Sequence, residues 1–281
     1  MKKVLLATSA LVMTAGFASA EVTLSGSARM GIVDDFGATG PVFSSRARVV
    51  FTMSGETDTG LAFGASFRAD NADEANDDGT AGSVFISGGF GKLSMGDVDS
   101  AANAAVGHVN GVGYTGLSDL NESTFIGGGT KESILYEYSA GAFTGYLSAG
   151  QREVAAETLS VAAKYSTDAY TVSLGYEDND AGTDHIIAGV DATFSAVTVK
   201  ARYGQASGAV DGDQWALSAT YSANGLGVTA FYTDDSEVGG AEAFGLGASY
   251  DLGGGASVAG GYVSNETTGN DAIDLGMNFS F

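Results

Sequence analysis

The last eleven residues, Asp271–Phe281, read DAIDLGMNFSF and indicate how the whole chain folds. From Ile273 onward, apolar side chains alternate strictly with polar or small ones, and the chain stops on an aromatic residue. A period of two places apolar side chains on one face of a β-strand and polar side chains on the other. This stretch therefore predicts a strand with one apolar face and one polar face.

The first twenty residues have a different character. Lys2 and Lys3 precede an apolar run, and small residues follow, ending in Ala18-Ser19-Ala20. A positive start, a short apolar core and an A-x-A site are typical of a secretory signal peptide. We therefore expect residues 1–20 to be a signal peptide and residues 21–281 to be a single exported domain.

Composition narrows the classes of protein further. The chain has 43 Gly, one Pro and no Cys, so a disulfide scaffold is excluded. Removing Lys2 and Lys3 changes the net charge from −22 to −24, and such a charge repels nucleic acid. No stretch beyond Ala20 approaches the ~20 apolar residues of a spanning helix. If the domain crosses a membrane, it does so as a closed β-barrel, which satisfies every backbone hydrogen bond.

The period-two pattern recurs along nearly the whole exported domain. The clearest runs are Val22–Val33, Val42–Ser54, Leu61–Ala69, Lys131–Ser139, Leu159–Ser166, Tyr170–Glu177, Val197–Gly204, Trp215–Ser222, Phe244–Asp251, Ser257–Val263 and Ala272–Phe281, with weaker runs near Val84, Leu93, Phe143, Ile186 and Val228. Roughly 16 residues per strand and link suit a spanning strand of ~9–11 residues. We expect an all-β fold, a transmembrane antiparallel barrel of 16 strands.

The links between these runs differ in kind. Short links rich in turn residues alternate with longer acidic ones, a pattern typical of outer-membrane barrels. The longer links are Asp70–Gly82, Asp178–Asp184, Asp211–Gln214, Asp234–Glu242 and Asn265–Asp271. Between Ser100 and Thr130 the alternation lapses, and a link of this length usually has a function. We expect this third long loop to fold into the lumen and narrow it.

Because side chains alternate between the two faces of a strand, the positions of the apolar residues predict which charged side chains face the lumen. Arginine facing lipid at mid-depth costs about 2–4 kcal/mol, so basic residues should point inward. These candidates are Arg29, Arg46, Arg48, Arg68, Lys200 and Arg202. The candidates for the opposing acidic side are Asp97, Asp99, Asp119 and Glu122. Two interpretations remain open: the basic residues brace the wall, or the two sets create a transverse field across a constriction.

The sequence offers no convincing catalytic or metal site. Gly111–Gly116 matches G-x-G-x-x-G, but no strand leads in and no helix follows. Asp70–Asp78 and Asp178–Asp184 could supply oxygen ligands to Ca²⁺, although neither has EF-hand spacing. Only His108 and His185 are present, without Cys, which makes a zinc site improbable. We expect no enzymatic activity and no resident metal.

Several blocks in order resemble a known family, the general-diffusion porins of the alphaproteobacterial outer membrane. The blocks are Glu21–Gly26, Phe43–Arg48, Phe51–Gly55, Gly64–Phe67, Gly91–Asp97, Val112–Thr115, Tyr138–Phe143, Ala248–Ser257 and the Phe281 terminus. The resemblance implies a 16-stranded homotrimer whose third long loop lies inside each barrel. It also implies an eyelet with Arg29, Arg46, Arg48 and Arg68 on the basic side and Asp97 and Asp119 on the acidic side, near which family members can bind Ca²⁺.

Three functions compete. We expect a passive, water-filled pore for ions and small hydrophilic solutes in the outer membrane, in contact with its lipids and lipopolysaccharide. The alternative is a substrate-selective channel, which would need a track of inward aromatic residues. A structural barrel or adhesin would need a filled lumen. We further expect Glu21 and Phe281 to lie where the first and last strands close the barrel.

Overall fold

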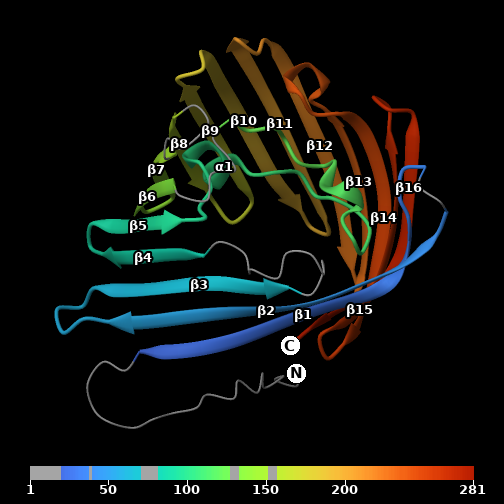
Figure 1. The fold of residues 1–281 in the computed structure, drawn as a ribbon, viewed down its shortest axis with the longest axis horizontal. Helices are drawn as coiled ribbons and strands as arrows, with labels where there is room; N and C mark the ends of the chain where they lie inside the picture. Colours follow the sequence, from blue (N-terminus) through green and yellow to red (C-terminus); the bar gives the residue numbers. More distant parts are fainter. Residues whose placement is uncertain (1–19, 38–39, 71–81, 127–132, 151–156) are drawn as a thin grey trace.

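The computed structural model describes residues 20–37, 40–70, 82–126, 133–150 and 157–281. Within these ranges, sixteen strands form one closed antiparallel barrel (Figure 1). Each strand pairs with its neighbours along the chain, and β1 pairs with β16. The expected fold class and strand number are confirmed. The expected signal peptide lies outside the described residues, except for Ala20.

The strand boundaries follow the period-two runs closely. The strands are β1 (Glu21–Asp34), β2 (Val42–Glu56), β3 (Ala62–Asp70), β4 (Ser83–Gly88), β5 (Gly91–Gly96), β6 (Ser133–Ala140), β7 (Phe143–Gly150), β8 (Thr158–Ser166), β9 (Tyr170–Asn179), β10 (Thr183–Phe194), β11 (Val197–Gly208), β12 (Gly212–Ala223), β13 (Leu226–Asp234), β14 (Glu242–Gly253), β15 (Ala256–Asn265) and β16 (Asn270–Ser280). Among the described residues, no helix is both long and apolar enough to cross a bilayer.

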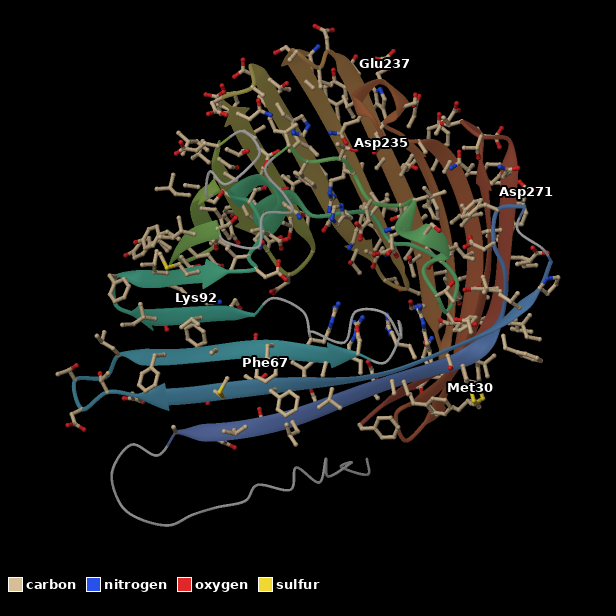
Figure 2. The ribbon with its side chains drawn as sticks, viewed as in Figure 1. Met30, Phe67, Lys92, Asp235, Glu237 and Asp271 are labelled. Carbon is tan, nitrogen blue, oxygen red and sulfur yellow. The ribbon has the colours of Figure 1, made fainter. Side chains whose placement is uncertain are left out.

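The outer face of the barrel is apolar. Leu24, Val161, Leu217 and Leu275 are each at least half exposed or close to it, and Met30 also projects outward from β1 (Figure 2). Exposed apolar patches of this extent mark a membrane or protein interface. The outer face is therefore suited to lipid.

Three of the expected acidic loops are shorter than the sequence suggested. The links between β9 and β10, β11 and β12, and β15 and β16 span only residues 180–182, 209–211 and 266–269. Asp178 and Asp184 are direct partners in the β9–β10 ladder, so the expectation that they belong to one acidic loop is wrong. The strands extend further because backbone pairing does not require apolar side chains. Most of the other loop considered for Ca²⁺, Asp70–Asp78, lies outside the described residues.

The link between β5 and β6 turns inward. It contains α1 (Ala101–Val106) and a short 3-10 turn, η1 (Leu117–Asp119). Figure 1 shows this green segment running across the inside of the ring of strands, from α1 beside β7–β9 to η1 beside β13–β16. Two apolar clusters hold it against the wall. One joins α1 to side chains such as Leu135 and Ile187, and the other joins Leu117 to side chains such as Phe231.

The closing ladder lies further along β1 than expected. Its direct partners run from Ser27 with Ser280 to Asp34 with Ile273. Phe281 continues it through two backbone hydrogen bonds with Gly26, at 2.9 and 3.2 Å. Glu21 instead pairs with Ser54 of β2, because β1 extends past the end of β16. The expectation for Phe281 agrees with this geometry, whereas that for Glu21 is wrong.

Candidate functional site

Four arginines and one aspartate gather on the inner face of β1–β3. Arg29 and Arg46 are direct partners across the β1–β2 ladder, and Arg48 is the direct partner of Asp70 across the β2–β3 ladder. The Arg48 Nε atom lies 2.8 Å from Asp70 Oδ1, and the Arg68 Nε atom lies 3.2 Å from Asp70 Oδ2. One carboxylate thus serves two guanidinium groups, and the cluster retains an excess of positive charge. We refer to these five residues as the arginine cluster.

Lys200 and Arg202 lie elsewhere on the inner wall, on β11, and Arg202 serves a bracing role. Its side chain is 3 % exposed, and its Nη1 atom lies 2.6 Å from Asp191 Oδ1. Its Nε atom donates to the Gly107 carbonyl oxygen at 3.1 Å. Arg202 therefore connects the wall to the end of α1. Lys200 is half-buried, directly opposite Asp191 in the β10–β11 ladder.

The four candidate acidic residues all belong to the loop, and they gather around His108. Asp99, Asp119 and Glu122 each act electrostatically on His108, and Asp97 acts on Asp99. Limited solvation of its charge raises the pKa of Asp99, and the Asp97 carboxylate adds to this effect. Desolvation lowers the pKa of His108, although Glu122 and Asp99 oppose that shift. The loop thus presents a largely anionic surface with a neutral imidazole within it.

The start of α1 is anchored by serine hydroxyls of the wall. The backbone N–H groups of Ala101 and Ala102 donate to Ser148 Oγ of β7 and Ser160 Oγ of β8, at 2.8 and 2.9 Å. The first N–H groups of a helix have no partner within the helix, so these hydroxyls satisfy them. Gly175 of β9 supplies the space, because a Cβ atom there would lie 2.6 Å from the Ala102 Cβ atom.

The middle of the loop is anchored at the seam where β1 meets β16. Gly31 and Gly276 are direct partners there, and a Cβ atom on either would come within 2.8 Å of the Tyr114 ring. Asp274 Oδ2 accepts hydrogen bonds from the Thr115 N–H and hydroxyl groups at 2.8 and 2.6 Å. The Thr115 carbonyl oxygen accepts from Arg29 Nη1 at 2.9 Å. A carboxylate that accepts several donors is a strong anchor.

The loop reverses direction in a strained turn. Leu117, Ser118 and Asp119 have φ values of 48°, 65° and 52°, in the left-handed region that favours glycine. Each non-glycine residue held there costs roughly 1–3 kcal/mol, so surrounding contacts must compensate. Burial of Leu117 in the wall is one such contact. The Thr233 hydroxyl supplies another by donating to the Leu120 carbonyl oxygen at 2.7 Å.

The sequence pattern did not single out most of these anchors. Asp274 could have been found, since parity places a carboxylate on the inner face of an otherwise small-residue strand. A second signal was the presence of glycine at three inward positions of the strands, Gly31, Gly175 and Gly276. Nothing about an open channel requires a residue without a side chain there. The partners of these residues in the loop follow no period, so pairing required the structure. Among the described residues, no group of three or more His, Cys, Asp or Glu side chains is arranged to hold a metal.

Comparison with known proteins identifies the barrel. The family model described as Gram-negative porin matches residues 7–272. The chain belongs to the Gram-negative porin family. A curated porin from Rhodobacter capsulatus is 39% identical, with 93% of this chain and 100% of the relative aligned. A porin from Fuscovulum blasticum is 29% identical over the same shares of the two chains.

Solved porins share the architecture. A porin structure refined at 1.8 Å superposes with a TM-score of 0.80 at 35% identity, covering 93% of this chain and 100% of the other. A triple mutant of Rhodopseudomonas blastica porin gives a TM-score of 0.78 at 26% identity, covering 92% and 100%. As a porin, the protein is an outer-membrane channel for diffusion and not an enzyme. The expectation for function and location is confirmed.

Proposed function

We propose that the diffusion channel is narrowed where the inward loop crosses the lumen, between the acidic surface around His108 and the arginine cluster. The observation that supports this proposal is the series of hydrogen bonds that attach the loop to the inner wall, from Ser148 on β7 to Asp274 on β16. The loop therefore occupies one arc of the wall, whereas the arginine cluster lies on β1–β3. Water and solute would pass between the two charged surfaces, with opposite charges on the two sides.

Such a channel passes small hydrophilic solutes passively and favours cations mildly at low salt. The acidic excess of the chain attracts cations, and the arginine cluster opposes them. Screening shortens to ~3 Å at 1 M salt, so the preference should fade there. Reversal potentials in planar bilayers under salt gradients measure it directly. Clear anion selectivity at low salt would show that the arginine cluster outweighs the loop and would refute this balance.

The alternative, a substrate-selective channel, is tested by solute flux. We expect swelling rates of porin-containing liposomes to fall smoothly with the size of uncharged sugars, without saturation. A rate that saturates for one solute class would favour the alternative. Two inner-facing aromatic side chains, Tyr146 and Phe231, are buried at 5 % exposure and offer solutes little contact surface, whereas a third, Phe85 of β4, is half-buried with Lys92 over its ring. The burial of Tyr146 and Phe231 supports the unselective pore over the substrate-selective one.

We propose the remaining assignments on the same basis. Three copies would associate through the apolar outer face to form a homotrimer, leaving the rest of that face for lipids and lipopolysaccharide. Crosslinking in detergent micelles would detect the trimer, and a monomer alone would refute it. The signal peptide would be removed before Glu21, as mass spectrometry of the N-terminus would show. No resident metal, Ca²⁺ included, is part of the proposal; addition of a chelator should leave conductance unchanged.

A further inference from the structure

Both histidines of the chain face one short piece of the inward loop. This piece, Ser123–Ile126, follows the strained turn and leads back toward β9; we call it the return arm. The Phe125 ring lies edge-on to both imidazoles, with centroids 5.5 Å from that of His108 and 6.2 Å from that of His185. His108 belongs to the loop itself and His185 to β10, so the return arm lies between two titratable side chains.

The contact with His108 fixes the state of one ring nitrogen. The Ser123 backbone N–H donates to His108 Nδ1 at 3.0 Å. A ring nitrogen can accept only when it carries no proton. His108 Nε2 therefore holds the single proton of a neutral imidazole and points toward Glu122 Oε2, 3.9 Å away. Protonation of Nδ1 would place two donors against each other and remove the bond to Ser123.

The contact with His185 is indirect but equally specific. The Gln214 side-chain amide pairs with the Thr124 backbone, accepting from its N–H at 3.0 Å and donating to its carbonyl oxygen at 2.9 Å. Because one of these two hydrogen bonds needs an acceptor and the other a donor, they fix which end of the Gln214 amide is Nε2. That Nε2 atom lies 2.7 Å from His185 Nε2, so the ring nitrogen must accept there. His185 Nδ1 then donates to Glu177 Oε2 at 3.2 Å.

Glu177 completes the attachment. Its Oε2 atom also accepts from the Ile126 N–H at 2.9 Å. Glu177, His185 and Gln214 are all at most 2 % exposed, so water has little access to replace a lost partner. A proton on His185 Nε2 would set two donors, this atom and Gln214 Nε2, against each other, and a buried donor without an acceptor costs roughly 1–3 kcal/mol. Ser123 of the return arm thus bonds one imidazole directly, whereas Thr124 and Ile126 bond Gln214 and Glu177, the two hydrogen-bond partners of the other imidazole.

We infer that His108 and His185 position the return arm, holding it against the wall as neutral hydrogen-bond acceptors near pH 7 and releasing it toward the lumen when acid protonates them. This inference rests on the proposed function only in its consequence for conductance. Release would place the arm in the path of ions, so acidification should reduce flow. Residues of the wall and loop would thereby make the channel sensitive to external acidity without a separate gating domain.

The surrounding charges set the direction of the pH dependence. Glu122, Asp99 and Asp119 favour a proton on His108, and Arg202 opposes it. Desolvation dominates and holds the pKa of His108 below its usual value of ~6.5. The docked state therefore binds fewer protons than the released state. Attachment of the arm is complete above the usual histidine pKa of ~6.5, and it is lost as the pH falls through the lowered pKa of His108. The acidic groups nearest His185 are Glu177 of β9, whose Oε2 atom lies 3.2 Å from His185 Nδ1, and Asp235, which accepts from the Thr124 hydroxyl at 2.7 Å.

Hydrogen–deuterium exchange of the trimer in micelles tests the arm directly. Peptides covering residues 123–126 should lose protection between pH 7.5 and pH 5, after correction for intrinsic exchange rates. Peptides covering 101–102 should keep theirs, since serine hydroxyls, which do not titrate, hold those N–H groups. A variant with His108→Asn and His185→Gln places untitratable acceptors near the same positions and should lose the pH response. Equal protection of the wild-type arm at both pH values, or an unchanged response in the variant, would overturn the inference.

Two further measurements separate the possible causes. The single His108→Asn variant leaves the buried His185 network intact and should lose the response at Ser123 alone; retention of that response would also overturn the inference. In bilayers, wild-type conductance should fall reversibly on acidification, and the double variant should show no such loss. If Glu177→Gln abolishes the response while the double variant keeps it, the carboxylate is responsible and the histidines are not. A protein that conducts poorly at pH 7.5 would refute the proposed function while exchange still decides the role of the histidines.

Discussion

Replacing Arg46 and Arg48 with Ser should change both the charge and the width of the channel. The arginine cluster has four guanidinium groups and one carboxylate, for a net charge of +3, and the double variant lowers it to +1. A unit charge ~8 Å from a passing ion contributes roughly 0.5 kcal/mol in water. Screening at 0.1 M salt reduces this to roughly half, so two charges shift the energy by about 0.5 kcal/mol.

This energy acts with opposite sign on cations and anions. In the double variant, the local concentration of cations rises by a factor of about two and that of anions falls by a similar factor. The cation-to-anion permeability ratio should therefore rise about fivefold at 0.1 M salt. The rise should nearly vanish at 1 M. Open-channel conductance at 1 M should still increase, because two long side chains leave the lumen. Bulkier sugars should also enter liposomes faster.

The assay is single-channel recording with a salt gradient, and the control is Arg46→Lys with Arg48→Lys. The lysine variant keeps both charges and most of the bulk, so its selectivity and conductance should stay close to wild type. Folding should survive in all variants because the lipid-facing side chains are untouched; heat-modifiable mobility on gels checks this. A serine variant with wild-type reversal potential and conductance would refute the reasoning and leave these arginines as braces of the wall.

Three further substitutions test the anchors and the closing strand. Gly175→Ala should push α1 off the wall at a cost of roughly 1–3 kcal/mol and lower conductance, whereas Gly145→Ala, where a Cβ atom meets nothing within 4 Å, should do neither; equal thermal unfolding and conductance in the two variants would contradict this. Asp274→Ala removes three hydrogen bonds, two of them to Thr115, and should raise open-channel noise without loss of the barrel. A variant whose current is as quiet as that of the wild type would show that the anchor is dispensable. Deletion of Phe281 removes both backbone bonds to Gly26 and should sharply lower the yield of folded trimer in the outer membrane, and an unchanged yield would exclude that role.

The strands could be predicted from the sequence because lipid imposes a simple rule on them. Each spanning strand must keep apolar side chains on one face, and that rule is visible without knowledge of any partner. The ends of the strands extend beyond the lipid, so this rule does not apply to them. Asp178 and Asp184 continue the β9–β10 ladder with polar side chains, so they were misread as a loop. The register of Glu21 was missed for a related reason, since no local pattern states how far β1 overhangs β16.

The candidate site could be predicted only in part. Side-chain alternation placed Arg46 and Arg48 on the inner face, where Arg48 pairs with Asp70 and Arg46 lies opposite Arg29. The path of the loop depends on contacts between residues far apart in sequence, such as Thr115 with Asp274. The histidines were judged only as metal ligands, because hydrogen-bond acceptance by a ring nitrogen leaves no signature in the sequence. Side-chain geometry was required to recognise their common neighbour.

The position of Tyr114 over Gly31 and Gly276 has a consequence for the order of assembly. These two glycines are 245 positions apart along the chain (276 − 31), and they become neighbours only when the barrel closes. The surface that receives the tyrosine ring does not exist in any earlier intermediate. Contacts of such long range form late, because loop closure is costly before they compensate for it. The segment around Tyr114 therefore reaches its final place only after the last strand has joined the first, whereas the surface that receives α1, on β7–β9, does not depend on that closure.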